Sequence, residues 1–114
     1  MKRIFLLCSI IALGSSPALA RPWVYLTSFS YSGTGEKCLR AARVALANAG
    51  FTREVYTSRF DSQEGGLVEA LLTNSPVRAK IECDPKIGIT SLAVSGLSND
   101  LTYEKYMVLF KAEW

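Results

Sequence analysis

The chain has 114 residues, a formal net charge of +3, and no histidine. One folded domain is the natural expectation at this length. Because histidine is the commonest general base and a principal zinc ligand, its absence argues against the usual catalytic triads and most metal sites. The sequence also contains no cofactor motif, so we expect no catalytic, cofactor-binding or metal site.

Residues 1–20 are typical of a secretory signal peptide. A short basic start precedes an apolar stretch over 4–13, and Ala18-Leu19-Ala20 has the small-residue pattern that signal peptidase accepts. The apolar stretch is roughly half as long as a bilayer-spanning helix. We therefore expect cleavage after Ala20, loss of Cys8 with the leader, no stable membrane anchor, and a periplasmic or secreted location.

The predicted mature domain covers 21–114. The leader contains two of the 13 basic residues and none of the ten acidic ones, so 11 basic against 10 acidic residues give a net charge of +1. No cluster of Lys and Arg is present in this domain. We therefore expect no nucleic-acid partner.

Residues 23–31 are rich in aromatic and β-branched residues and predict a strand. The odd positions form a mainly aromatic face, and the even positions carry smaller side chains. Two interpretations remain open for this face: it packs into the core, or it forms an exposed binding patch. The candidate patch residues are Trp23, Tyr25, Phe29 and Tyr31.

A helix is predicted from its N-cap Thr34 to a left-handed stop at Gly50, with Phe51 folding back on the last turn. Its apolar stripe consists of Cys38, Leu39, Ala42, Ala45, Leu46 and Ala49. Cys38 therefore lies on the face that we expect to be buried.

The middle of the chain predicts further strands at 52–60, 77–83 and 87–95. A polar loop with a flexible glycine exit is expected over 61–66. Residues 67–73 fit either a short strand or a helical turn, and the turn signal that follows favours the strand. The strand at 77–83 alternates apolar and charged residues, which indicates one buried and one solvated face.

The segment 98–114 predicts a closing helix, capped by Ser98, Asn99 or Asp100, although its aromatic residues also alternate as a strand would. The predicted order is strand, helix, three or four strands, helix. Successive hairpins favour an α+β fold, an antiparallel sheet of four to five strands with both helices on one face.

Cys38 and Cys83 are the two cysteines of the predicted mature chain. In an exported protein such a pair predicts a disulfide, here between the first helix and the sheet. A redox pair would favour the Cys-x-x-Cys spacing, which is absent.

This order of signals resembles small, uncharacterised exported bacterial proteins. The resemblance covers most of 23–114 and rests on Cys38-Leu39-x-x-Ala42-x-x-Ala45-Leu46-x-x-Ala49-Gly50-Phe51, Ala79-Lys80-Ile81-Glu82-Cys83 and Ala93-Val94-Ser95-Gly96. It implies the topology and the disulfide, but no activity and no site residues.

Two further features of the sequence bear on binding and catalysis. Ser32-Gly33-Thr34-Gly35 superficially resembles a phosphate-binding turn, but it lacks the full motif and Glu36 would repel a phosphate. A hydrolase would require several carboxylates to converge in a cleft. The candidates are Asp61, Glu64, Glu69, Glu82 and Asp84.

The favoured hypothesis is a non-catalytic exported protein that binds a periplasmic or extracellular protein, as an inhibitor, immunity or accessory protein does. A small-ligand carrier is the alternative and would need a cavity lined by the aromatic residues. A carboxylate-dependent hydrolase is the third hypothesis. The sequence does not indicate the oligomeric state.

Overall fold

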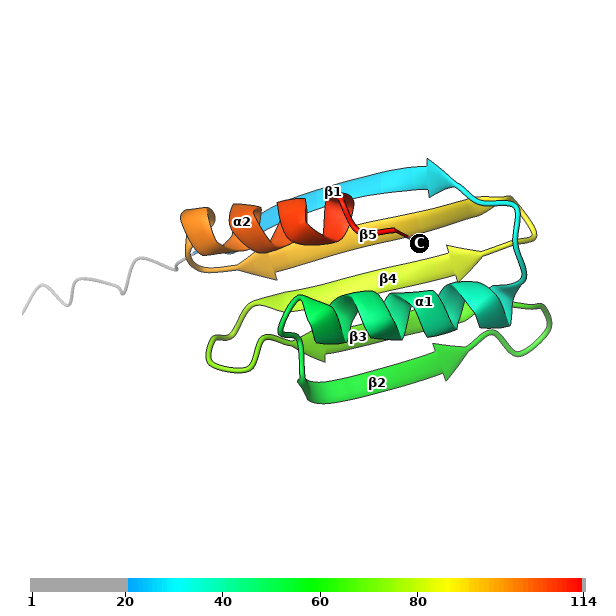
Figure 1. Cartoon of the computed structure of the whole chain (residues 1–114), viewed down its shortest axis with the longest axis horizontal. Coiled ribbons are helices and arrows are strands. Elements are labelled where there is room, and N and C mark those ends of the chain that lie inside the picture. Colours follow the sequence, from blue (N-terminus) through cyan, green and yellow to red (C-terminus); the bar gives the residue numbers. More distant parts are fainter. Residues whose placement is uncertain (1–20, 114) are drawn as a thin grey trace, which may run out of the picture.

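The structure is a computed structural model that describes residues 21–113 (Figure 1). The predicted leader, its cleavage site and Trp114 lie outside the described residues. Seven elements follow one another in the chain: β1 (Trp23–Ser30), α1 (Gly35–Asn48), β2 (Arg53–Arg59), β3 (Gly66–Leu71), β4 (Arg78–Asp84), β5 (Ile89–Gly96) and α2 (Asn99–Phe110).

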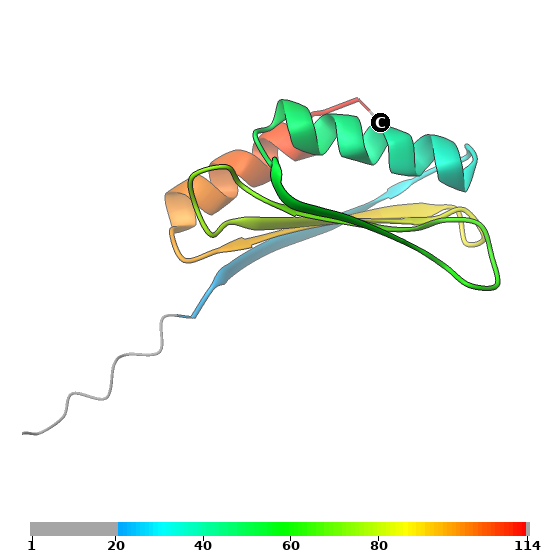
Figure 2. The same cartoon turned by 90° about the horizontal axis from the view of Figure 1, so that it is seen from below.

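The five strands form one sheet in the order β1-β5-β4-β3-β2, and every neighbouring pair is antiparallel. Both helices cover the same face of this sheet, α1 over β3 and β4, and α2 over β5 and β1 (Figure 2). The opposite face has no helix over it. The α+β fold with two helices on one face is thus confirmed.

The alternation of apolar and charged residues in the sequence matches the two faces of the sheet. In β4, Ala79, Ile81 and Cys83 are buried beneath the helices, while Lys80 and Glu82 are exposed on the other face. The segment that fitted either a strand or a helical turn forms β3. The last strand begins two residues later than predicted, because Gly88 donates its N–H to the Pro85 carbonyl and closes a turn first.

The predicted caps of α1 are confirmed. Thr34 Oγ1 accepts a hydrogen bond from the Lys37 N–H at 3.2 Å, which satisfies one of the free donors at the helix start. At the other end Gly50 has a φ of 90°, and Phe51 folds back and is buried. Local sequence signals therefore set both ends of this helix.

The predicted disulfide joins Cys38 of α1 to Cys83 of β4, with their Cα atoms 6.0 Å apart. Both cysteines are buried, and Thr90 of β5 places its hydroxyl 3.3 Å from Cys38 Sγ. Since a disulfide sulfur carries no hydrogen, the Thr90 hydroxyl is the donor. The bridge therefore connects the helix layer to the centre of the sheet.

The closing helix is confirmed, but it ends at Phe110, four residues before the chain does. Of the three residues considered for its cap, Ser98 is the one that accepts the Leu101 N–H, at 3.4 Å. Within residues 21–113, neither helix has the length and hydropathy needed to cross a bilayer.

Candidate functional site: the open face of the sheet

The four aromatic residues singled out in the sequence lie on the helix side of the sheet or at its end. The Tyr25 ring is 5.2 Å from the Tyr103 ring and 5.5 Å from the Tyr106 ring, both of α2. Phe29 likewise lies 5.7 Å from Phe110. These distances are those of aromatic rings in contact, so the rings fill the space between β1 and α2.

Two further contacts fix this arrangement. The Tyr25 hydroxyl donates a hydrogen bond to Asn99 Oδ1 at the start of α2. The Tyr31 hydroxyl donates to the Thr34 carbonyl in the turn before α1, at 3.1 Å. Among the candidate patch residues, Trp23 keeps the largest exposure, with half of its surface accessible.

The uncovered face of the sheet is formed by the other set of alternating positions. The register aligns Leu26 of β1 with Ala93 of β5, Ala93 with Lys80 of β4, and Lys80 with Glu69 of β3. Leu26 is 70% exposed, the largest value among the exposed large hydrophobic residues of the described chain. This row crosses four strands and mixes apolar with charged side chains.

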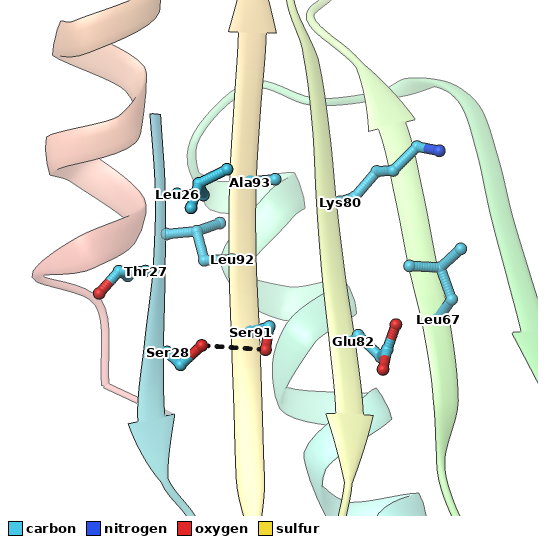
Figure 3. A pocket seen from close by; sticks show the side chains of 9 residues that line it. All are labelled: Leu26, Thr27, Ser28, Leu67, Lys80, Glu82, Ser91, Leu92 and Ala93. Carbon is cyan, nitrogen blue, oxygen red and sulfur yellow. Dashed lines mark hydrogen bonds between the residues drawn. The ribbon is translucent and has the colours of Figure 1, made fainter. Parts of the chain in front are cut away.

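A shallow depression of about 320 Å³ lies on this face (Figure 3). We call it the open-face depression. Of its nine lining residues, two belong to the helix-facing positions of β1 and β5. The remaining seven point to the open face: Leu26, Ser28, Leu67, Lys80, Glu82, Ser91 and Ala93.

The depression has a small, neutral floor and an apolar rim on two sides. Ser28 and Ser91 lie on adjacent strands with their hydroxyl oxygens 3.2 Å apart, and Ala93 follows Ser91 on the same face (Figure 3). Leu26 stands on the β1 side and Leu67 on the β3 side. An apolar side chain of another molecule fits this composition.

Lys80 and Glu82 are neighbouring residues of opposite charge on the open face of β4, within the depression. Lys80 Nζ lies 3.2 Å from Glu69 Oε2, and Arg78 lies 3.6 Å from the same carboxylate oxygen. Glu82 is exposed, and among the described residues it makes no ion pair. Its carboxylate is therefore available to a cation of another molecule.

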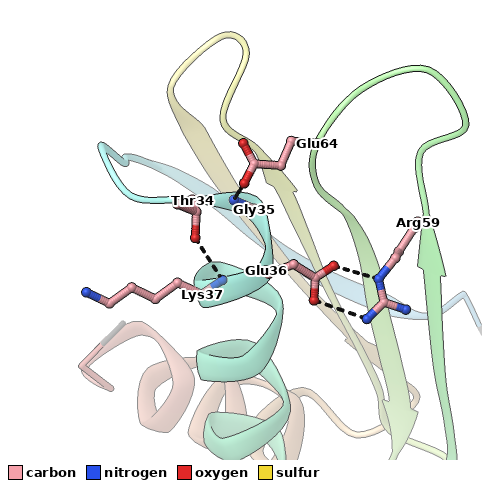
Figure 4. Close-up of polar contacts among 6 residues, drawn as sticks. All are labelled: Thr34, Gly35, Glu36, Lys37, Arg59 and Glu64. Atoms are coloured by element: carbon pink, nitrogen blue, oxygen red, sulfur yellow. Dashed lines mark hydrogen bonds and ion pairs between the residues drawn. The ribbon is translucent and has the colours of Figure 1, made fainter.

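The turn that resembles a phosphate-binding loop is already occupied. The Gly35 N–H, the first of α1, donates to Glu64 Oε1 at 2.7 Å (Figure 4). Since a helix N-terminus favours one nearby anion, the Glu64 carboxylate takes the place that a phosphate would need. The turn is a capping structure.

Beside it, Arg59 of β2 donates two hydrogen bonds to Glu36 of α1, at 2.7 and 3.2 Å (Figure 4). These bonds and the positive charge of the guanidinium hold the pKa of the Glu36 carboxyl below its ordinary value. The pair links the first turn of α1 to the end of β2.

The five candidate carboxylates are divided between two regions. Asp61 is exposed in the loop after β2, where Glu64 is engaged with α1, and Asp84 accepts a hydrogen bond from Gln63 of the same loop at 3.1 Å. Glu69 and Glu82 lie on the open face. Nowhere in residues 21–113 do three His, Cys, Asp or Glu side chains gather as a metal ion would need.

The open-face depression was not found from the sequence, although its signal was present. The strand at 77–83 was expected to have a solvated face, and that face contributes Lys80 and Glu82. What the sequence did not reveal is that Leu26 and Leu67, 41 positions apart, lie on the same face with only β5 and β4 between their strands. No protein-family model matches this chain, and no curated protein is significantly similar to it.

Proposed function

We propose that this chain is an exported, non-catalytic protein-binding module of the inhibitor, immunity or accessory type, and that its partner binds the open face of the sheet. The observation that carries this proposal is the open-face depression. It combines the exposed Leu26 and the half-buried Leu67 with the Glu82 carboxylate, which has no ion-pair partner among the described residues, on a face that no helix covers.

The chemistry of this face suits a protein partner. Burial of Leu26 and Leu67 would supply hydrophobic free energy of roughly 25 cal/mol per Å² of apolar surface. Glu82 and Lys80 would orient the partner, because charged groups at an interface contribute mainly to specificity and to the rate of association. The expected partner presents an apolar side chain beside a basic group.

The rigidity of the site favours binding as well. The floor of the depression belongs to β1 and β5, and its two charged residues belong to β4. On the other side of the sheet, the disulfide connects α1 to β4 and the Thr90 hydroxyl connects it to β5. A site on a sheet that is held rigid in this way loses little conformational entropy when a partner binds.

Export is supported by the leader pattern and by the disulfide, since disulfides form and persist in oxidising compartments. The position of cleavage is tested by intact mass spectrometry without reductant. The expected mass is that of residues 21–114 minus two hydrogens, and an uncleaved chain or two free thiols would contradict this part of the proposal.

The binding function is tested by affinity capture from a periplasmic extract. The wild-type protein is expected to enrich one protein, and Ala93→Arg is expected to lose it, because the larger side chain fills the depression. Ala47→Arg is the matched control, since Ala47 is exposed on α1 on the opposite face. Failure of the wild type to enrich any protein, or equal capture by both variants, would contradict the proposal.

A further inference from the structure

The two edges of the sheet differ in how they are protected. The β2 edge carries Arg53, Glu54 and Arg59, and its pairing with β3 is interrupted by a register shift between Arg53 and Tyr56. Glu54 within this irregularity has a φ of 49°. Charges and bulges of this kind keep an edge strand from pairing with another molecule.

The β1 edge has neither charged residues nor an irregularity in its pairing. Its eight residues from Trp23 to Ser30 include no charged residue and no proline, and they pair with β5 in unbroken register. Natural sheets seldom leave a long, regular, uncharged edge open, because its free N–H and C=O groups are a template for another strand. The contrast with β2 points to β1 as a pairing edge.

The direction of the free backbone groups follows from the ladder. The Tyr31 N–H donates to the Gly88 carbonyl at 2.8 Å, in the same register that continues through β1 and β5. In an antiparallel pair these bonds alternate, so the odd-numbered residues of β1 bond to β5. The N–H and C=O groups of Val24, Leu26 and Ser28 therefore point away from the sheet.

Exposed apolar side chains flank this edge on both faces. Tyr103 and Phe110 of α2 belong to the helix side, where their rings contact those of Tyr25 and Phe29. The exposed fractions along the edge are 50% for Trp23, 50% for Tyr103, 41% for Phe110, 52% for Val24 and 70% for Leu26. Together they offer roughly 400–500 Å² of side-chain surface.

We propose that a second copy of this chain binds here, its β1 antiparallel to the first, so that two five-stranded sheets become one. Two such surfaces offer roughly 800–1,000 Å² before the backbone is counted, and the paired strands add to this toward the lower limit of about 1,200 Å² for a stable interface. Because β1 and the apolar side chains that flank it carry no charge, no repulsion between like charges opposes self-association. A two-fold axis also makes any such contact self-complementary.

The register of the pairing follows from the alternation of side chains. Residues opposite each other must belong to the same face, so the two-fold axis passes midway between the two copies of one residue of β1. Centred on Leu26, the pairing sets Leu26 against Leu26 of the second copy on the open face. On the helix side it sets Trp23 against Phe29 of the second copy, so apolar residues meet on both faces.

The test is the oligomeric state in solution, measured by light scattering coupled to size-exclusion chromatography. The protein is expressed from the full chain and purified as it accumulates in the cell. Wild type is expected at twice the mass of its denatured chain. Ser28→Pro is expected to be a folded monomer, because proline removes an outward N–H and places its ring where the second strand would lie. It breaks no backbone hydrogen bond to β5 and loses only the exposed contact between the Ser28 and Ser91 hydroxyls.

Thr57→Pro is the matched control on the other edge and is expected to stay dimeric. The Phe60 N–H donates to the Gly65 carbonyl, so by the same alternation the Thr57 N–H points away from β3. Val24→Lys is a second variant that leaves the backbone intact and is expected to be monomeric, because it adds the charge that β1 lacks.

A wild-type protein that remains monomeric at every concentration overturns the inference, as does a Thr57→Pro variant that becomes monomeric with its fold intact. A dimer that persists in both Ser28→Pro and Val24→Lys overturns it too. Leu26 belongs to both the dimer edge and the open-face depression, but the two proposals fail separately, since Ala93→Arg is expected to dimerise normally whether or not it captures a partner.

Discussion

At the scale of single residues, Gly65 shows how closely the loop after β2 approaches the sheet. This glycine is buried and has a φ of 104°. A Cβ atom added to it would lie 2.1 Å from the Cys83 carbonyl oxygen and 2.8 Å from Pro85 Cδ. Both the backbone angle and the space around it therefore require glycine.

Gly65→Ala is accordingly expected to lower the free energy of unfolding by more than about 2 kcal/mol, since a left-handed angle and a backbone clash add together. Chemical denaturation monitored by circular dichroism measures this loss. Gly88→Asn is the control: its φ is 72°, but the nearest atom to an added Cβ is 3.5 Å away. Asparagine tolerates this angle, so a cost below about 1 kcal/mol is expected. Equal costs in the two variants would contradict the steric explanation.

The sequence predicted residue-scale features where their causes are local. Thr34 and Gly50 were recognised as helix caps because the helix that they cap adjoins them in the chain. Gly65 was predicted to be part of a flexible loop exit, whereas it is buried. Its constraint comes from Cys83, which is distant in sequence, and no local pattern reveals that contact.

At the scale of elements, the disulfide connects the best-defined helix to the central strand. Cys38 and Cys83 are 45 positions apart, and closing a loop of that length restricts the unfolded chain. The bridge is also buried, with the Thr90 hydroxyl donating to it. Its contribution to stability is therefore expected to exceed that of any single surface contact.

The variant with both Cys38→Ala and Cys83→Ala is expected to lose about 2–4 kcal/mol in free energy of unfolding, as small exported domains do when a native disulfide is removed. Urea denaturation with and without reductant measures the loss. Reductant should shift the wild-type midpoint and leave the variant unchanged. A wild type whose midpoint is the same in both conditions would show that the bridge does not contribute as expected.

The closing helix shows why one element remained ambiguous. Its aromatic residues fit both a helical stripe and a strand alternation, and the sequence alone favoured the helix without deciding it. The contacts that decide it are tertiary, because Tyr106 and Phe110 lie against Tyr25 and Phe29 of β1. The sequence predicted that the aromatic residues of the first strand and of the tail pack on each other or on the first helix, and the ring contacts show that they pack on each other.

At the scale of the whole molecule, the sequence predicted the layers but not the strand order. Amphipathic helices and alternating strands require one covered and one open face. The order β1-β5-β4-β3-β2 depends on long-range pairing, above all that of the first strand with the last. That pairing makes β1 an edge and brings Leu26 and Leu67 to one depression, so both candidate surfaces follow from the strand order.

This order also predicts how amide exchange varies across the sheet. The amides of β4 are expected to exchange slowest, because β4 lies between two strands and is joined to α1 by the disulfide. The outward amides of Thr57 and Arg59 on the β2 edge should exchange fast at any concentration. Those of Val24, Leu26 and Ser28 on β1 should be protected in concentrated wild-type protein and lose that protection on dilution.

Hydrogen exchange followed by NMR separates these amides residue by residue. The Val24→Lys variant should show fast exchange at Leu26 and Ser28 even when concentrated, while Tyr25 and Thr27, which bond to β5, stay protected. Equally fast exchange at the outward amides of both edges in concentrated wild type would contradict pairing through β1. In that case the slower exchange of the odd-numbered amides would still test the pairing of β1 with β5. One measurement therefore tests both the pairing within the sheet and the pairing between two copies.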